Sequence, residues 1–199
     1  MKPLLPGLCV LLLAACGHGE PPSTATSPTE ASTPAIKPVP PGASSTATDP
    51  TAMARYDGYG DMRFGMDPAA FAKAWGGELK GAPPAPGSSC SYKTPKWVKS
   101  SRDFAFMFED GHFVRYDVGT AKEAAPGGGR IGMSVAQIHA LYGAAVAEQP
   151  HKYVEGAKIL RVASPQGDGV LVFETGADAK VTRWRVGVPP QVDYVEGCG

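Results

Sequence analysis

An internal repeat constrains the fold of this chain more than any other feature of its sequence. Segments 64–76 and 131–143 carry matching residues 67 positions apart: a Gly-Met pair, an apolar helix face and a closing glycine. A sequence that repeats itself at such a period predicts one supersecondary unit that occurs twice. We therefore expect two similar repeat units, one over residues 53–125 and the other over residues 126–199.

Each copy of the repeat opens with the pattern of a short amphipathic helix. In the first copy Asp67 precedes Pro68, which is typical of an N-cap followed by proline at the first helical position. In the second copy Ser134 and Gln137 have the spacing of a capping box. Helices of about two turns are not stable alone, so we expect both to pack on a sheet. The fold class expected is α+β.

Strand patterns follow the helix in each copy. Segment 104–118 has an Asp-Gly dipeptide between two runs rich in aromatic and β-branched residues, which is typical of a hairpin with a type I′ turn. A two-residue turn would place Phe106 opposite Arg115, on one face of the sheet. The second copy carries a similar hairpin over 169–186, preceded by an extra strand over 157–163.

The N-terminus has the pattern of an export signal. Lys2 supplies a positive charge, and the apolar run 4–13 is too short for a transmembrane helix. The tetrapeptide Leu13-Ala14-Ala15-Cys16 resembles the lipobox at which bacterial lipoproteins are cut before the cysteine. We therefore expect residues 1–15 to be a signal peptide. Cys16 is then expected to carry a diacylglyceryl group and an acyl chain such as palmitate.

The residues after the lipobox predict where the protein is held. Several acyl chains give stable anchoring in a membrane. Gly17 follows the cysteine, at the position where an Asp is the usual inner-membrane retention signal of such lipoproteins. We therefore expect the periplasmic side of the outer membrane, with the inner membrane as the alternative. Residues 16–52 are rich in Pro, Ser and Thr and poor in large apolar side chains, which predicts a disordered linker.

Charge and cysteine content narrow the possible partners and chemistry. The chain has 19 Lys and Arg residues and 19 Asp and Glu residues, so we expect no nucleic-acid partner. Cys9 leaves with the signal and Cys16 takes the lipid, so Cys90 and Cys198 remain. In the oxidising periplasm this pair predicts a disulfide. A metal site or reactive thiol is the alternative, and it lacks His or Asp at ligand spacing nearby.

The second copy resembles the SmpA/OmlA outer-membrane lipoproteins in three motifs. These are Ile131-Gly132-Met133-Ser134, Leu141-Tyr142-Gly143 and Val172-Phe173-Glu174. The same unit of a helix followed by an antiparallel sheet occurs twice in the β-lactamase inhibitor protein, where it forms one concave sheet surface. The resemblance implies two tandem units of this kind. This chain differs from the inhibitor protein because it offers one disulfide bridge rather than one in each unit. No inhibitory contact residue of that protein is therefore assigned to this chain.

The sequence contains no motif of an enzyme that we recognise. Its four histidines are His18, His112, His139 and His151, and no two of them have a metal-ligand spacing such as His-x-x-x-His. The glycine-rich segment 126–130 lacks the Lys-Ser/Thr of a phosphate loop, and Gly-x-Ser-x-Gly is absent. We therefore expect no catalytic residue, metal or cofactor.

The remaining functional candidate is a surface rich in phenylalanine and arginine. If Tyr116 and Trp184 pack beneath the sheet, these residues would lie on the open face, and such side chains dominate binding hot spots. The alternative is that the phenylalanines fill a core and the arginines flank it. The candidate residues are Phe104, Phe106, Phe113, Arg115, Arg183, Arg185 and Trp97.

Taken together, these patterns predict a lipid-anchored binding or scaffolding lipoprotein without enzymatic activity. Its partner is expected to be a protein of the cell envelope, and its role is expected to lie in envelope assembly. One alternative is an inhibitor of a protease, lysozyme or β-lactamase. A less favoured alternative is a hydrolase whose site the sequence does not show.

Overall fold

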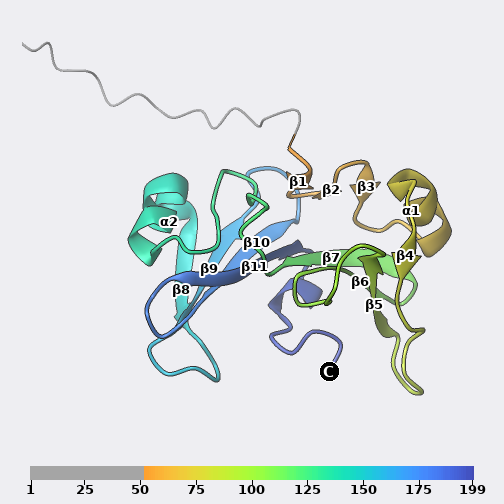
Figure 1. Ribbon diagram of the computed structural model, residues 1–199. Coiled ribbons are helices and arrows are strands. Elements are labelled where there is room, and N and C mark those ends of the chain that lie inside the picture. The colour runs from red at the N-terminus through yellow and green to blue at the C-terminus, as the bar shows by residue number, and fades with distance from the viewer. Residues whose placement is uncertain (1–51) are drawn as a thin grey trace, which may run out of the picture. The chain divides into compact units, whose positions relative to one another are not determined.

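An eight-stranded antiparallel sheet dominates the computed structural model, which describes residues 52–199 (Figure 1). The expected signal peptide 1–15, the lipidation site Cys16 and the expected linker up to residue 51 lie outside the described residues. In spatial order the strands of the sheet are β4 (Leu79–Lys80), β5 (Cys90–Pro95), β6 (Phe104–Glu109), β7 (His112–Val118), β11 (Val181–Gly187), β10 (Val170–Thr175), β9 (Lys158–Ala163) and β8 (Val146–Pro150).

The other elements are short. A three-stranded sheet contains β1 (Ala54–Arg55), β2 (Gly58–Tyr59) and β3 (Met62–Arg63). The helices are α1 (Pro68–Trp75) and α2 (Val135–Tyr142), with 3-10 turns η1 (Gly143–Ala145) and η2 (Gln191–Asp193). The fold is therefore a mixed α+β fold in which strands predominate. No helix among residues 52–199 is long and apolar enough to cross a membrane.

Both helices begin at the caps that the sequence predicts. The Asp67 side chain accepts hydrogen bonds from the backbone N–H groups of Ala69, at 2.8 Å, and Ala70, at 2.9 Å. Ser134 and Gln137 form the full capping box at the start of α2. Each cap satisfies N–H groups that have no partner within the helix, which fixes where the helix starts.

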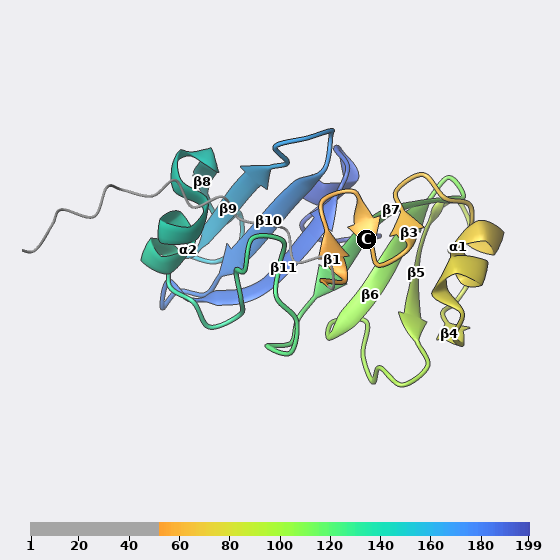
Figure 2. The same cartoon turned by 90° about the horizontal axis from the view of Figure 1, so that it is seen from above.

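The main core lies between the large sheet and the layer formed by α1, α2 and the three-stranded sheet (Figures 1 and 2). Phe71 of α1 and Ile138 of α2 are fully buried there. The Phe71 ring meets the Phe106 ring edge to face, with centroids 4.9 Å apart. Burying one such side chain contributes about 1.5 to 3 kcal/mol, so the sheet stabilises helices too short to form alone.

A β-bulge changes the predicted register of the first hairpin. Its turn is as expected, since Asp110 and Gly111 have φ angles of 50° and 75° and Phe108 pairs with Phe113. Beyond that pair the register shifts, and Phe106 pairs with Tyr116 rather than Arg115. The extra residue in β7 puts Phe106 and Arg115 on opposite faces of the sheet, so the prediction that they share a face is wrong.

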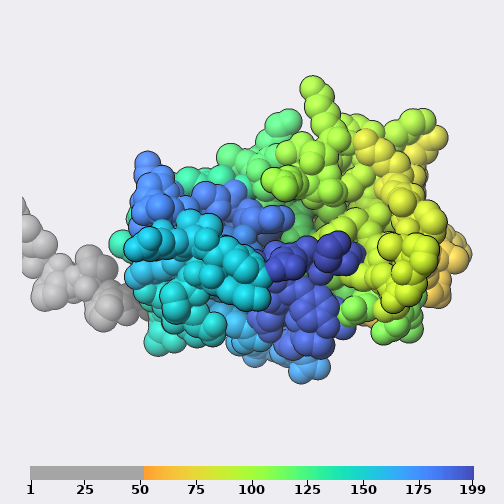
Figure 3. All heavy atoms as spheres, turned by 90° about the horizontal axis from the view of Figure 1, so that it is seen from below, coloured from red at the N-terminus to blue at the C-terminus, as the bar shows by residue number. Residues whose placement is uncertain are grey.

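The C-terminal segment 188–199 crosses the opposite face of the sheet (Figures 1 and 3). The predicted disulfide is confirmed: Cys90 and Cys198 are bonded, with Cα atoms 5.3 Å apart and a sequence separation of 108. A small apolar cluster contains both cysteines together with Met107 and Val114. The bridge therefore ties the end of the chain to strand β5.

Candidate functional site

The phenylalanines proposed for an exposed face lie in the core. Phe104, Phe106 and Phe113 are at most 5% exposed, and they pack with the helices and the three-stranded sheet. The prediction of an open aromatic face is therefore wrong, and the alternative that these rings fill a core is confirmed. The aromatic rings contact one another mainly edge to face, an arrangement that adds to the free energy of burial.

The arginines on the other face of the sheet are also covered. Arg115 and Arg185 are each 1% exposed. Arg115 pairs with Asp117, with 2.6 Å between Nη2 and Oδ1, and it donates to the backbone carbonyl oxygens of Gln191 and Tyr194, at 3.0 and 2.6 Å. These acceptors belong to the C-terminal segment, so Arg115 holds that segment onto the sheet.

Arg185 has a similar role beside Arg115. It pairs with the Glu174 carboxylate and donates to the backbone carbonyl oxygen of Val192. Burial and the neighbouring Arg115 lower the pKa of Arg185. Burial also opposes the charge of Arg115, but Asp117 outweighs it and the pKa of Arg115 is raised. Buried charges need such partners, so Arg115 and Arg185 have a structural role and do not form a binding surface.

The two remaining candidates, Arg183 and Trp97, retain access to solvent. The side chain of Arg183 is 33% exposed and lies 3.8 Å from carboxylate oxygens of Asp117 and Glu174. Trp97 is 74% exposed, the largest value among the large apolar residues that the structure describes as exposed. Of the predicted residues, only Trp97 therefore presents a large aromatic surface.

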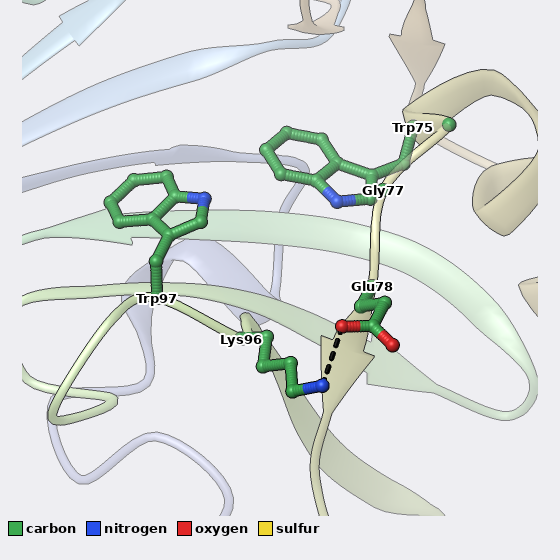
Figure 4. A pocket seen from close by; sticks show the side chains of 6 residues that line it. Trp75, Gly77, Glu78, Lys96 and Trp97 are labelled. Carbon is green, nitrogen blue, oxygen red and sulfur yellow. Dashed lines mark ion pairs between the residues drawn. The ribbon is translucent and has the colours of Figure 1, made fainter.

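Trp97 borders a groove whose other wall is Trp75 (Figure 4). The volume of the groove is about 470 Å³, which lies within the range of small-molecule and side-chain pockets. Gly76 and Gly77 contribute backbone to the lining, and the polar side chains come from Glu78 and Lys96. We call this hollow and its six lining residues the tryptophan groove.

The end of α1 positions Trp75. Gly76 caps the helix with a φ angle of 69°, a conformation that glycine adopts without the cost of a side chain. A Cβ atom on Gly77 would come within 2.9 Å of the Trp75 indole nitrogen, so this second glycine lets the chain pass close to the ring. The inner edge of Trp75 packs on Phe106, with centroids 5.4 Å apart.

Pairing of β4 with β5 brings the Trp97 side of the groove close to Trp75. The backbone N–H of Lys96 donates to the Glu78 carbonyl oxygen at 3.0 Å, which extends the ladder by one residue pair. The Lys96 Nζ atom lies 2.6 Å from Glu78 Oε2, and these side chains are 67% and 73% exposed. Such an exposed pair contributes at most about 1 kcal/mol, but it leaves the groove without net charge.

Both indole N–H groups border the groove and are free to donate. Figure 4 shows the Trp97 nitrogen on the side of its ring that faces Trp75, and the Trp75 nitrogen on the side that faces Glu78. In the part of the chain that the structure describes, neither nitrogen has a protein acceptor. The groove therefore offers two hydrogen-bond donors, two aromatic faces and one neutralised ion pair.

The groove has few groups that could take part in acid-base or metal chemistry. It holds one carboxylate and one ammonium, already paired with each other. Among residues 52–199 there is also no group of three or more His, Cys, Asp or Glu side chains placed to hold a metal.

Sequence reasoning found one wall of this groove and missed the rest. Trp75 falls on the apolar helix face of segment 64–76, and Glu78 and Lys96 belong to no motif. The available signal was the Gly76-Gly77 pair directly after Trp75, which predicts a close backbone approach beside the ring.

Comparisons with known proteins leave the family open. No protein-family model matches the chain, and no curated protein matches it. Among solved structures it is similar to an extracellular protein containing a SCP domain from Bacillus anthracis str. Ames, with 10% sequence identity and a TM-score of 0.42 over 63% of this chain. The chain covers 44% of that protein's length, and so slight a likeness carries no conclusion about function.

Proposed function

We propose that this protein is a lipid-anchored binding or scaffolding lipoprotein on the periplasmic side of the outer membrane. In this proposal it takes part in envelope assembly and engages a protein partner through the tryptophan groove. The observation that carries the proposal is Trp97, which is 74% exposed beside a second tryptophan and an open hollow.

An exposed indole at a hollow is what a binding site requires. Tryptophan is the residue most typical of interface hot spots because it brings a large, rigid apolar surface and one N–H donor. Leaving that surface in water forgoes the stabilisation of burial, about 25 cal/mol for each Å². Contact with a partner recovers this stabilisation. The lipobox of the sequence supports an anchor that holds the groove at a membrane.

We also infer that the chain contains two tandem units. Strands β4 to β7 fill one half of the sheet and β8 to β11 fill the other, in mirrored order, so that β7 meets β11 at the centre. Each half is associated with one helix that follows a Gly-Met pair, in agreement with the sequence repeat. The inhibitor alternative rests on the same two-unit sheet and stays a prediction.

Co-purification from cells tests the proposal. The tagged full-length chain is compared with Trp97→Ala and with Tyr153→Ala, which removes another exposed aromatic ring, 53% exposed, near the opposite edge of the sheet. Loss of a hot-spot tryptophan costs about 2 kcal/mol or more, or roughly 30-fold in affinity. We expect chemical crosslinking and mass spectrometry to show loss of specific envelope proteins with Trp97→Ala alone. Equal recovery with both variants would contradict the proposal.

The anchor has its own test. Changing Cys16→Ser removes the thiol that takes the lipid, so we expect the protein to move from the membrane fraction to the soluble periplasmic fraction. Retention of this variant in membranes would contradict the lipoprotein assignment.

A further inference from the structure

We propose that the tryptophan groove binds a proline-rich segment of its partner in the polyproline II conformation. This inference rests on the proposed function, because it names the class of ligand for the same groove. It follows from the hydrogen-bonding groups, the charge and the shape of the six lining residues.

The hydrogen-bonding groups of the groove match those of a polyproline II strand. The free groups include the indole N–H donors of Trp75 and Trp97, and both border the hollow (Figure 4). A polyproline II segment has no internal hydrogen bonds, so all its carbonyl oxygens are available as acceptors, and proline has no N–H that needs a partner. These carbonyl oxygens would pair with the two indole donors, whose burial without a partner would cost about 1 to 3 kcal/mol per group.

The charge of the groove favours an uncharged ligand. Glu78 and Lys96 neutralise each other at 2.6 Å, and no other charged side chain lines the hollow. A phosphate or carboxylate ligand would gain from Lys96 and lose to Glu78. A glycan would bring many hydroxyl groups, for which the groove offers only Glu78, Lys96 and the two indole N–H groups as side-chain partners. Proline rings have no such requirement.

The shape of the groove also suits a stiff, narrow chain. Gly76 and Gly77 carry no side chain, so a ligand can approach the backbone beside Trp75. Pro-rich segments dock in aromatic-lined grooves elsewhere because their conformation is already restricted, so that little entropy is lost on binding. The two indole rings are rigid and the polyproline II helix of the ligand is preformed, so their contact costs little conformational entropy.

Intrinsic fluorescence provides a direct readout of this contact. The chain has three tryptophans, and Trp184 is fully buried in the core. A change of emission on addition of ligand therefore reports Trp75 and Trp97. The lipidated full-length protein in detergent is titrated with a blocked oligoproline of about ten residues, roughly three turns of polyproline II helix. A Gly-Ser peptide of equal length and chitohexaose are titrated in parallel.

We expect saturable binding of the oligoproline alone. Trp97→Ala should weaken it at least about 30-fold, as for a hot-spot residue, whereas Tyr153→Ala should leave it unchanged. Gly77→Ala is a second variant, since its Cβ would press against Trp75 and narrow the groove; it should also weaken binding. Circular dichroism should show that each variant is folded, which is expected for Trp97 because its ring is not part of the core.

The outcomes separate this inference from the proposed function. If the oligoproline does not saturate by roughly 1 mM while Trp97→Ala still loses its partners in cells, the ligand class is wrong and the proposed function stands. If neither effect occurs, both are wrong. Saturation by chitohexaose in place of oligoproline would show a glycan site and overturn the inference.

Discussion

Removal of the Cys90–Cys198 disulfide is expected to cause a large loss of stability. The bridge spans a sequence separation of 108, and the chain-entropy model assigns about 4.8 kcal/mol to a loop of that length. Residual structure in the unfolded chain lowers this value, so we expect a decrease of about 3 to 5 kcal/mol in the free energy of unfolding. Typical domains have only about 5 to 15 kcal/mol in total.

The structure also predicts which segment opens first when the disulfide is removed. Segment 188–199 is held by the disulfide, by Arg115 through the carbonyls of Gln191 and Tyr194, and by Arg185 through that of Val192. Without the bridge, the last residues lose their covalent attachment to β5. Amide hydrogen exchange should therefore rise first in this segment, and only later in the central strands of the sheet.

Urea unfolding of the double variant Cys90→Ser, Cys198→Ser against the oxidised wild type measures the loss. Wild type in excess reductant is the matched control, since it should unfold like the variant if the covalent bond is the cause. A difference below about 1 kcal/mol, well under the expected entropy of loop closure, would refute the reasoning. So would an unchanged rate of exchange over 188–199.

Three further predictions follow from the packing and the charges. Phe106→Ala should lower the free energy of unfolding by about 3 to 5 kcal/mol, because the ring is fully buried among other rings; a loss under about 1 kcal/mol in urea would contradict its place in the core. Glu174→Ala should lower the free energy of unfolding by about 3 to 5 kcal/mol because it leaves the buried Arg185 without its carboxylate partner. Adding Arg185→Met should recover much of that loss, whereas simple addition of the two losses would contradict the pairing. The Ala70 and Ala69 N–H groups lower the pKa of Asp67 below its ordinary 3.8, so this cap stabilises the fold above that pH and its contribution is lost as the pH falls through the folded-state pKa. Stability curves from pH 7 to 2 should therefore be shallower in acid for Asp67→Ala, and identical slopes would contradict the cap.

The elements of the fold follow from local patterns that the sequence displays. Asp67 and Ser134 start the helices, and the Asp-Gly dipeptide makes the turn. Cys90 and Cys198, the two cysteines left after the expected signal peptide and lipidation site, pair with each other. These features depend on neighbours within a few residues or, for the disulfide, on the elimination of other partners. Local chemistry is therefore sufficient to predict them.

The faces of the sheet could not be predicted in the same way. One extra residue in β7 turned Arg115 away from Phe106, and no local pattern indicated that bulge. Segment 188–199 has no strand or helix periodicity, yet its carbonyl groups are what make the burial of Arg115 possible. The tryptophan groove likewise depends on the pairing of the two-residue strand β4 with β5, which is too short to recognise from its sequence.

Site-specific photo-crosslinking at position 97 in living cells tests the central claim most directly. A photoreactive tryptophan analogue, which keeps the indole, replaces Trp97 in one strain, and a photoreactive phenylalanine analogue replaces Tyr153 in another. The adducts are identified by mass spectrometry. We predict an adduct at position 97 with an envelope protein, joined within a proline-rich segment, and none with that protein at position 153. Absence of an adduct at position 97, or the same adducts at both positions, would contradict a binding site in the tryptophan groove.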